Sequence, residues 1–104
     1  MEIKKVNIQQ KLDTIQEFWS LREVAQINDH VVEIAKLKGE YEMHAHDTGE
    51  KIFYILSGEL QIQFDEETSV AVGQGEFVVI PNNTVHKPIA KEETHILLFE
   101  PKYK

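Results

Sequence analysis

The chain has 104 residues, of which 41% are hydrophobic and 28% charged, with a formal net charge of −7 and no cysteine. Its length fits one domain, residues 1–104, and the missing cysteines exclude disulfides and thiolate chemistry. The acidic balance disfavours nucleic acid and anionic membranes as partners.

Residues 1–30 form an N-terminal arm that differs from the rest. In "NIQQKLDTIQEFWS" the spacing of Ile8, Leu12 and Ile15 predicts a short amphipathic helix, and Trp19 is expected to pack in a core or a dimer contact. A strand follows at 21–28. The chain shows neither the apolar segment of a signal peptide nor a run long enough to span a membrane, so we expect a cytoplasmic protein.

Beyond the arm, the sequence has the texture of an all-β protein. Short runs of alternating apolar and polar residues are separated by turn signals such as "SG", "DEET", "GQG" and "PNNT". The expected strands lie at 30–38, 41–46, 51–57, 59–64, 69–72, 76–80, 85–90 and 94–100. This pattern predicts a small antiparallel β-barrel or jelly roll (a double-stranded β-helix), with the short N-terminal helix outside it.

Three of the five histidines suggest a metal site. His44 and His46 are two apart in a strand-like segment, so their side chains share a face. His86 follows the turn at 81–83, and a barrel can bring it beside them. Neutral imidazole is a good ligand for divalent ions, and a three-histidine site leaves coordination positions open. A solvated polar pair is the alternative for His44 and His46 alone.

The order of these residues resembles the cupin superfamily over roughly residues 31–100. "HAHDTGE" and "FYILSGEL" match the first cupin motif, and "GEFVVIPNNTVH" matches the second. The resemblance implies a metal held inside the barrel by His44, His46, His86 and a glutamate. Asn83 replaces a glycine of the second motif, which is tolerable because asparagine adopts left-handed backbone angles readily. Ala90 replaces its asparagine.

The glutamate of the first motif does not fit both of its anchors. Counted from His46, Glu50 stands at a permitted position, but counted back from Gly58 the position is Lys51. A one-residue offset in a strand reverses the side chain's face. Either a bulge turns Glu50 inward as a fourth ligand, or Lys51 faces the site and repels the ion.

The strand at 51–57 also predicts the pocket lining. Phe53 and Ile55 share the phase of Lys51 and are expected to face the barrel interior. His95 has two interpretations, a histidine bonded to backbone or a pocket residue.

The function expected from these features is binding of a divalent metal (Zn, Fe, Mn or Ni) and binding of, or action on, a small organic molecule. If the protein is an enzyme, the resemblance implies a metal-dependent oxygenase-like or isomerase-like reaction. The alternatives are a non-catalytic ligand-binding barrel and a metal-free barrel with a relict pocket. We expect a homodimer, because so small a domain gains from burying its arm against a partner.

Overall fold

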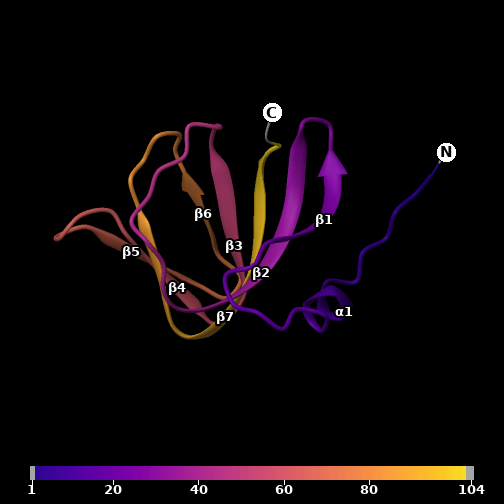
Figure 1. Cartoon of the computed structure of the whole chain (residues 1–104), viewed down its shortest axis with the longest axis horizontal. Coiled ribbons are helices and arrows are strands. Elements are labelled where there is room, and N and C mark those ends of the chain that lie inside the picture. Colours follow the sequence, from indigo (N-terminus) through magenta and orange to yellow (C-terminus); the bar gives the residue numbers. More distant parts are fainter. Residues whose placement is uncertain (1, 103–104) are drawn as a thin grey trace.

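The computed structural model of the protein describes residues 2–102, which form one short helix and seven strands (Figure 1). The elements, in chain order, are α1 (Ile8–Leu12), β1 (Arg22–Ile27), β2 (His30–Glu40), β3 (Lys51–Ser57), β4 (Glu59–Gln63), β5 (Ser69–Gly73), β6 (Phe77–Ile80) and β7 (Lys87–Pro101). Within the described residues, no helix has the length and apolar character needed to cross a membrane.

The strands pair antiparallel in the order β1-β2-β7-β3-β6, and β4 joins β5 to β7. They curve around a common interior, with β4 and β5 facing β2 and β3 across it (Figure 1). The fold is therefore the expected antiparallel jelly-roll type. Among the described residues the ladder ends at β1 and β6, so the sheet is not closed and "barrel" is only an approximate description.

Strand β7 joins the two halves of the structure. Its first residues pair with β4 (Gln61 with Ile89), and its later residues pair with β3 (Ile52 with Phe99). Along nearly its whole length the other edge pairs with β2. The sequence predicted two strands here, at 85–90 and 94–100. The polar residues at 91–93 resemble a turn, but they are exposed residues of one strand at the place where it changes partner.

The hydrophobic core fills the interior between the two halves. Alternate residues of β3 point inward, so Phe53 and Ile55 are buried, as the sequence predicted. They belong to one apolar cluster with side chains from neighbouring and facing strands, which include Leu37, Leu60, Ile62, Val72, Ile80, Ile96 and Leu98. The apolar alternation of the strands therefore specifies the inner face.

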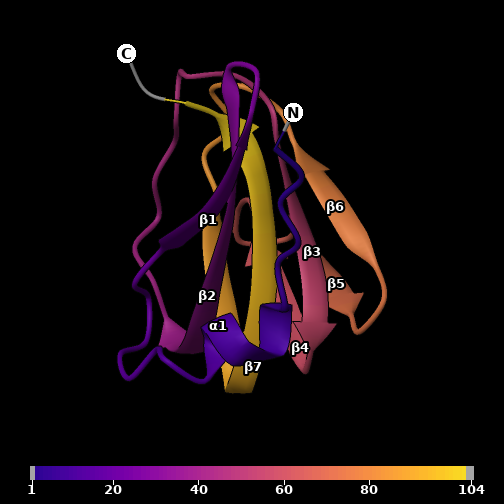
Figure 2. The same ribbon diagram turned by 90° about the vertical axis from the view of Figure 1, so that its right-hand side faces the viewer.

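The N-terminal arm covers the outer face of the sheet. Figure 2 shows α1 and the preceding residues in front of β2, β7 and β3. Leu12 and Ile15 are buried there against Ile34 and Val24 in a second apolar cluster. The predicted helix exists but is short, because the chain leaves the helical path after its C-cap at Asp13.

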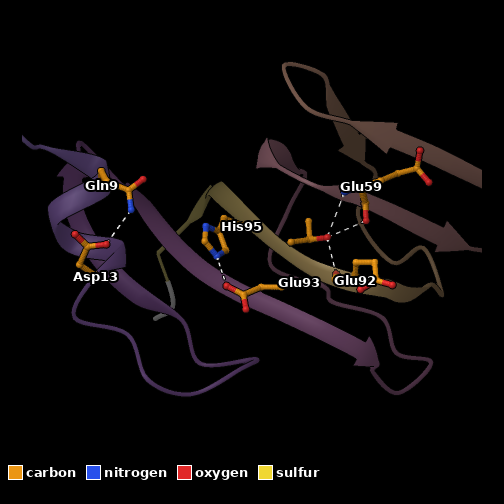
Figure 3. Close-up of polar contacts among 7 residues, drawn as sticks. Gln9, Asp13, Glu59, Glu92, Glu93 and His95 are labelled. Carbon is orange, nitrogen blue, oxygen red and sulfur yellow. Dashed lines mark hydrogen bonds and ion pairs between the residues drawn. The ribbon is translucent and has the colours of Figure 1, made fainter.

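A close contact between the two halves fixes the turn from β3 to β4. The hydroxyl of Thr94 is fully buried; its Oγ1 accepts a hydrogen bond from the Glu59 amide (3.3 Å) and lies 3.0 Å from the carbonyl oxygens of Glu59 and Glu92 (Figure 3). Gly58 has a φ of +87° and lies directly against Thr94. A side chain at position 58 would collide with this hydroxyl, so the turn requires glycine for two separate reasons.

Candidate metal centre

Backbone hydrogen bonds hold the two histidine-bearing segments together. The predicted strand at 41–46 is reduced to an isolated bridge, in which His44 N donates to His86 O (2.9 Å) and His86 N donates to His44 O (2.8 Å). The Asn83 amide donates to His46 O at 2.7 Å, and Asn83 has the predicted left-handed φ of 59°. These bonds bring segments some 40 positions apart in the sequence into register.

The three imidazoles converge as the sequence predicted. One ligand nitrogen from each of His44, His46 and His86 can be chosen so that all lie within 4.8 Å of one another. The ring centroids of His44 and His86 are 4.5 Å apart, and those of His44 and His46 are 4.7 Å apart. His86 is 1% exposed, whereas the other two are half-buried and face the cavity. The cluster could therefore bind an ion on the cavity side.

The hydrogen bonds of two rings determine which nitrogen is free. His44 Nδ1 lies 2.7 Å from the carbonyl of Glu42, and His86 Nδ1 lies 2.8 Å from the carbonyl of Thr84. Because a carbonyl only accepts, each Nδ1 must carry the proton, and each Nε2 presents a lone pair. His86 Nε2 is buried and has no hydrogen-bond partner. Such an unpartnered nitrogen beside two further imidazoles fits a metal ligand.

The electrostatics of the cluster keep two of these rings neutral. Burial lowers the pKa of His46, and the positive charge of Lys51 lowers it further. Burial also lowers the pKa of His86. Since metal binding requires the unprotonated ring, these shifts extend the ligand form to lower pH.

Lys51, not Glu50, occupies the inward position at the start of β3. Glu50 is exposed and does not belong to the imidazole cluster, whereas Lys51 is 6% exposed. No bulge turns Glu50 inward, because β3 begins at Lys51 and its burial alternates regularly as far as Ile55; the register shift in β3 comes later, between Ile55 and Ser57. The Lys51 ammonium lies 3.8 Å from Glu100 Oε1, so a carboxylate compensates its charge.

A cavity of about 340 Å³ adjoins the histidines. His44, His46, Lys51 and Phe53 contribute to its wall, together with Glu33 and Glu100 and a set of apolar and aromatic side chains: Trp19, Leu37, Tyr41, Ile96 and Leu98. This volume is within the range of small-molecule sites, and the lining combines apolar walls with a few polar groups.

Two of the expected pocket residues lie elsewhere. Ile55 faces the interior but is fully buried in the core and does not line the cavity. His95 does not line it either, because it alternates with the inward residues Ile96 and Leu98 of β7. Its Nε2 lies 2.7 Å from the Glu93 carboxylate (Figure 3). The partner of His95 is therefore a side chain, not the backbone.

Two acidic residues of the cavity were not singled out from the sequence. Glu33 of β2 and Glu100 of β7 lie on adjacent strands, and burial followed by the neighbouring Glu100 carboxyl raises the pKa of Glu33 to about 8. Strand alternation could have identified both residues. Glu33 lies on the same inward face of β2 as Val31 and Ala35, and Glu100 lies on the same inward face of β7 as Ile96 and Leu98. The alternation within one strand does not show that a charged residue on another strand compensates the charge.

Comparisons with known proteins agree with this fold. The family model "Cupin domain" matches residues 30–100. A cupin-2 domain containing protein from Shewanella frigidimarina superposes with a TM-score of 0.89 at 35% identity, covering 93% of this chain and 94% of that one. A Neisseria meningitidis protein superposes with a TM-score of 0.85 at 24% identity, covering 95% and 100%. The uncharacterised protein YdbB of Bacillus subtilis (strain 168) is 34% identical over 64 residues, 62% of this chain and 57% of the relative's length.

Proposed function

The chain belongs to the cupin domain family, and on that premise we propose that it binds a divalent metal ion through His44, His46 and His86 and holds a small organic ligand in the adjoining cavity. The observation that carries the proposal is the unpartnered, buried His86 Nε2 beside the other two imidazoles. A donor set of three imidazoles suits zinc, iron, manganese or nickel. When bound, such an ion polarises a ligand oxygen as a Lewis acid.

The chain's own residues supply binding and orientation. Carbonyl groups of Glu42 and Thr84 fix the rings of His44 and His86. Apolar walls exclude water from a ligand in the cavity, and Phe53 lies next to His86, with a centroid distance of 6.2 Å. The reaction classes this arrangement supports are oxygenase-like or isomerase-like steps on a metal-bound ligand.

A second candidate is a binding protein that performs no chemistry. It is favoured by Lys51, which stands inward where the first cupin motif has a glutamate. A site with three neutral ligands and a nearby ammonium holds an ion less tightly than one with a carboxylate. Turnover of any small carbonyl or enol compound that depends on added metal would exclude this alternative.

The experiment is metal analysis of protein purified without an affinity tag. We compare the wild type with His44→Ala/His86→Ala and with the matched control His30→Ala/His95→Ala, which removes two histidines outside the cluster. Each protein is dialysed with excess Zn²⁺ and then against buffer. We expect about one ion per chain in the wild type and the control, and almost none in the cluster variant. Equal metal content in all three proteins would refute the site.

We further propose that the protein forms a homodimer. The support is the small size of the domain and the exposed apolar side chains of Phe77 and Val79 on the edge strand β6. Sedimentation tests this: a species at the chain mass of 12.1 kDa at micromolar concentration would contradict it.

A further inference from the structure

A second polar group of side chains lies in the same cavity as the histidines. It consists of Glu33 on β2, Glu100 on β7 and Lys51 on β3, and we refer to these three as the charged cluster. The three strands are neighbours in the order β2-β7-β3, so the side chains converge on one wall. The Phe53 ring lies near both groups, because Lys51 Nζ is 5.6 Å from its centroid and the centroid of the His86 ring is 6.2 Å from it.

The charged cluster has unused hydrogen-bonding capacity. Glu33 Oε1 is buried and has no hydrogen-bond partner. Lys51 Nζ is 3.8 Å from Glu100 Oε1, which is longer than a hydrogen bond. A buried polar atom without a partner is costly, so a native protein leaves one where a ligand or a water supplies the missing bond.

The charges of the cluster nearly cancel. Lys51 and Glu100 form an ion pair, and burial, followed by a hydrogen bond to Glu100, raises the pKa of Glu33 to about 8, so the two carboxyl groups together hold about one proton at pH 7. An incoming carboxylate or ammonium is attracted by one member of the Lys51–Glu100 pair and repelled by the other, so neither gains enough to offset the cost of burying its charge. A hydroxyl or amide can both donate and accept, and therefore satisfies carboxyl and ammonium together.

We propose that the charged cluster binds an uncharged hydroxyl or amide group of a small ligand whose other end coordinates the metal at the three histidines. The ligand class is thus a short bifunctional molecule, with oxygen donors at one end, an apolar middle beside Phe53, and a neutral hydrogen-bonding group at the other end. This inference rests on the proposed metal site and adds the specificity of the cavity to it.

Hydroxamates of three to six carbons are suitable probes, since the hydroxamate head binds zinc whatever the tail carries. Five tails are compared on the zinc-loaded protein by calorimetry: hydroxyl, primary amide, methyl, carboxylate and ammonium. We expect the hydroxyl or amide probe of the best length to bind about tenfold more tightly than the other three, which is what one or two good hydrogen bonds provide. Tighter binding of the carboxylate, ammonium or methyl probe overturns the proposal.

An apolar variant tests whether the charged cluster causes the ranking. Lys51→Met/Glu33→Leu/Glu100→Leu replaces all three charged groups together, which buried ion pairs often tolerate without loss of the fold. When both proteins are saturated with zinc, the order of probe affinities in this variant should reverse in favour of the methyl probe, and its circular dichroism should match that of the wild type. The control Lys91→Met, at an exposed position, should keep the wild-type order.

The experiments distinguish a failure of the proposed metal site from a failure of the ligand inference. A wild-type protein that holds no zinc fails the proposed function, and the inference falls with it. A protein that holds zinc but binds all five probes equally, or keeps the same preference in the apolar variant, overturns the inference alone. If the apolar variant does not fold, Glu33→Leu, which removes the hydrogen-bonding group but leaves Lys51 and Glu100 in place, is compared on the same probes, and an unchanged hydroxyl preference in it counts against the proposal.

Discussion

The Lys51 ammonium lies 3.8 Å from the Glu100 carboxylate, and both side chains are almost fully buried, at 6% and 12% exposure. This pair explains how a lysine is accommodated where the first cupin motif has a glutamate. Burial lowers the pKa of Lys51, while Glu100 and then Glu33 oppose that shift. The cation is thus held by its neighbours and does not need to leave the interior.

Removing only the cation should destabilise the protein. Lys51→Met leaves Glu100 buried without a counter-ion, and we expect the free energy of unfolding to fall by about 2–4 kcal/mol at pH 8. In Lys51→Met/Glu100→Leu most of this loss should be recovered, because both charges are gone. Urea unfolding measures the effect. If the double variant were less stable than the single one, the pair would not be the cause.

The placement of Lys51 and Glu50 predicts how metal affinity can be changed. Lys51→Glu/Glu100→Lys exchanges the pair and puts a carboxylate beside the histidines, so zinc affinity should rise by about tenfold or more. Glu50→Gln should change it by less than about threefold, since an exposed residue outside the cluster contributes little. Competition with a zinc indicator measures both. A large loss in Glu50→Gln, with no gain from the exchange, would identify Glu50 as the fourth ligand.

Gly58→Ala should be far more damaging than an alanine at a comparable glycine. A Cβ at position 58 would lie 2.7 Å from Thr94 Oγ1 and 2.9 Å from Glu93 O, whereas one at Gly75, whose φ of +84° is nearly the same, meets nothing within 4 Å. Gly75→Ala should therefore cost about 1 kcal/mol from backbone strain alone, and Gly58→Ala about 2–4 kcal/mol. Thermal unfolding compares the two. Equal losses would show that φ alone requires glycine at 58.

The sequence predicted those features that depend on local alternation. Residues 51–57 were expected as a strand with Phe53 inward, and β3 has these bounds and this phase. The three histidines were identified because spacing in a strand and a motif both placed them. These properties follow from side-chain periodicity, which a sequence displays directly.

Other features depend on pairing between strands, which the sequence does not display. Residues 91–93 were expected to separate two strands, yet they belong to one strand that changes partner. Two positions were possible for the inward residue near His46, and the regular phase of β3 decided for Lys51. Its stabilising partner Glu100 comes from β7, about 50 residues away, so local patterns did not reveal it.

The raised pKa of Glu33 predicts a dependence of stability on pH. Its pKa rises from 4.5 to about 8 through burial and then the Glu100 carboxyl, with a smaller contribution from Glu23; Lys51 opposes the shift. The folded state keeps a proton that the unfolded chain loses, so between pH 4.5 and 8 this group makes wild-type stability fall as pH rises. Glu33→Gln removes the effect.

The measurement is the free energy of unfolding of both proteins at pH 5 and pH 9. Glu33 is partly exposed, which limits the effect. We expect the free energy of unfolding of Glu33→Gln, relative to that of the wild type, to rise by only about 1–2 kcal/mol from pH 5 to pH 9. Contributions that are the same in both proteins cancel in the difference. A constant difference between the two proteins would show that Glu33 titrates normally.

Trp19 should report metal binding, because it is the one tryptophan of the chain and lines the cavity. Its indole Nε1 donates to Lys38 O at 2.9 Å, its ring stacks on Tyr41 at 5.1 Å, and Tyr41 contacts His44 at 5.3 Å. Cu²⁺, which binds imidazole sites strongly, should quench its fluorescence by about twofold or more at one equivalent. Zn²⁺ has a filled d shell, so it should bind without quenching and should reduce the effect of Cu²⁺ added later.

In His44→Ala/His86→Ala the quenching at one equivalent should disappear. Equal quenching in that variant would place the copper on other groups and remove this support for the three-histidine site.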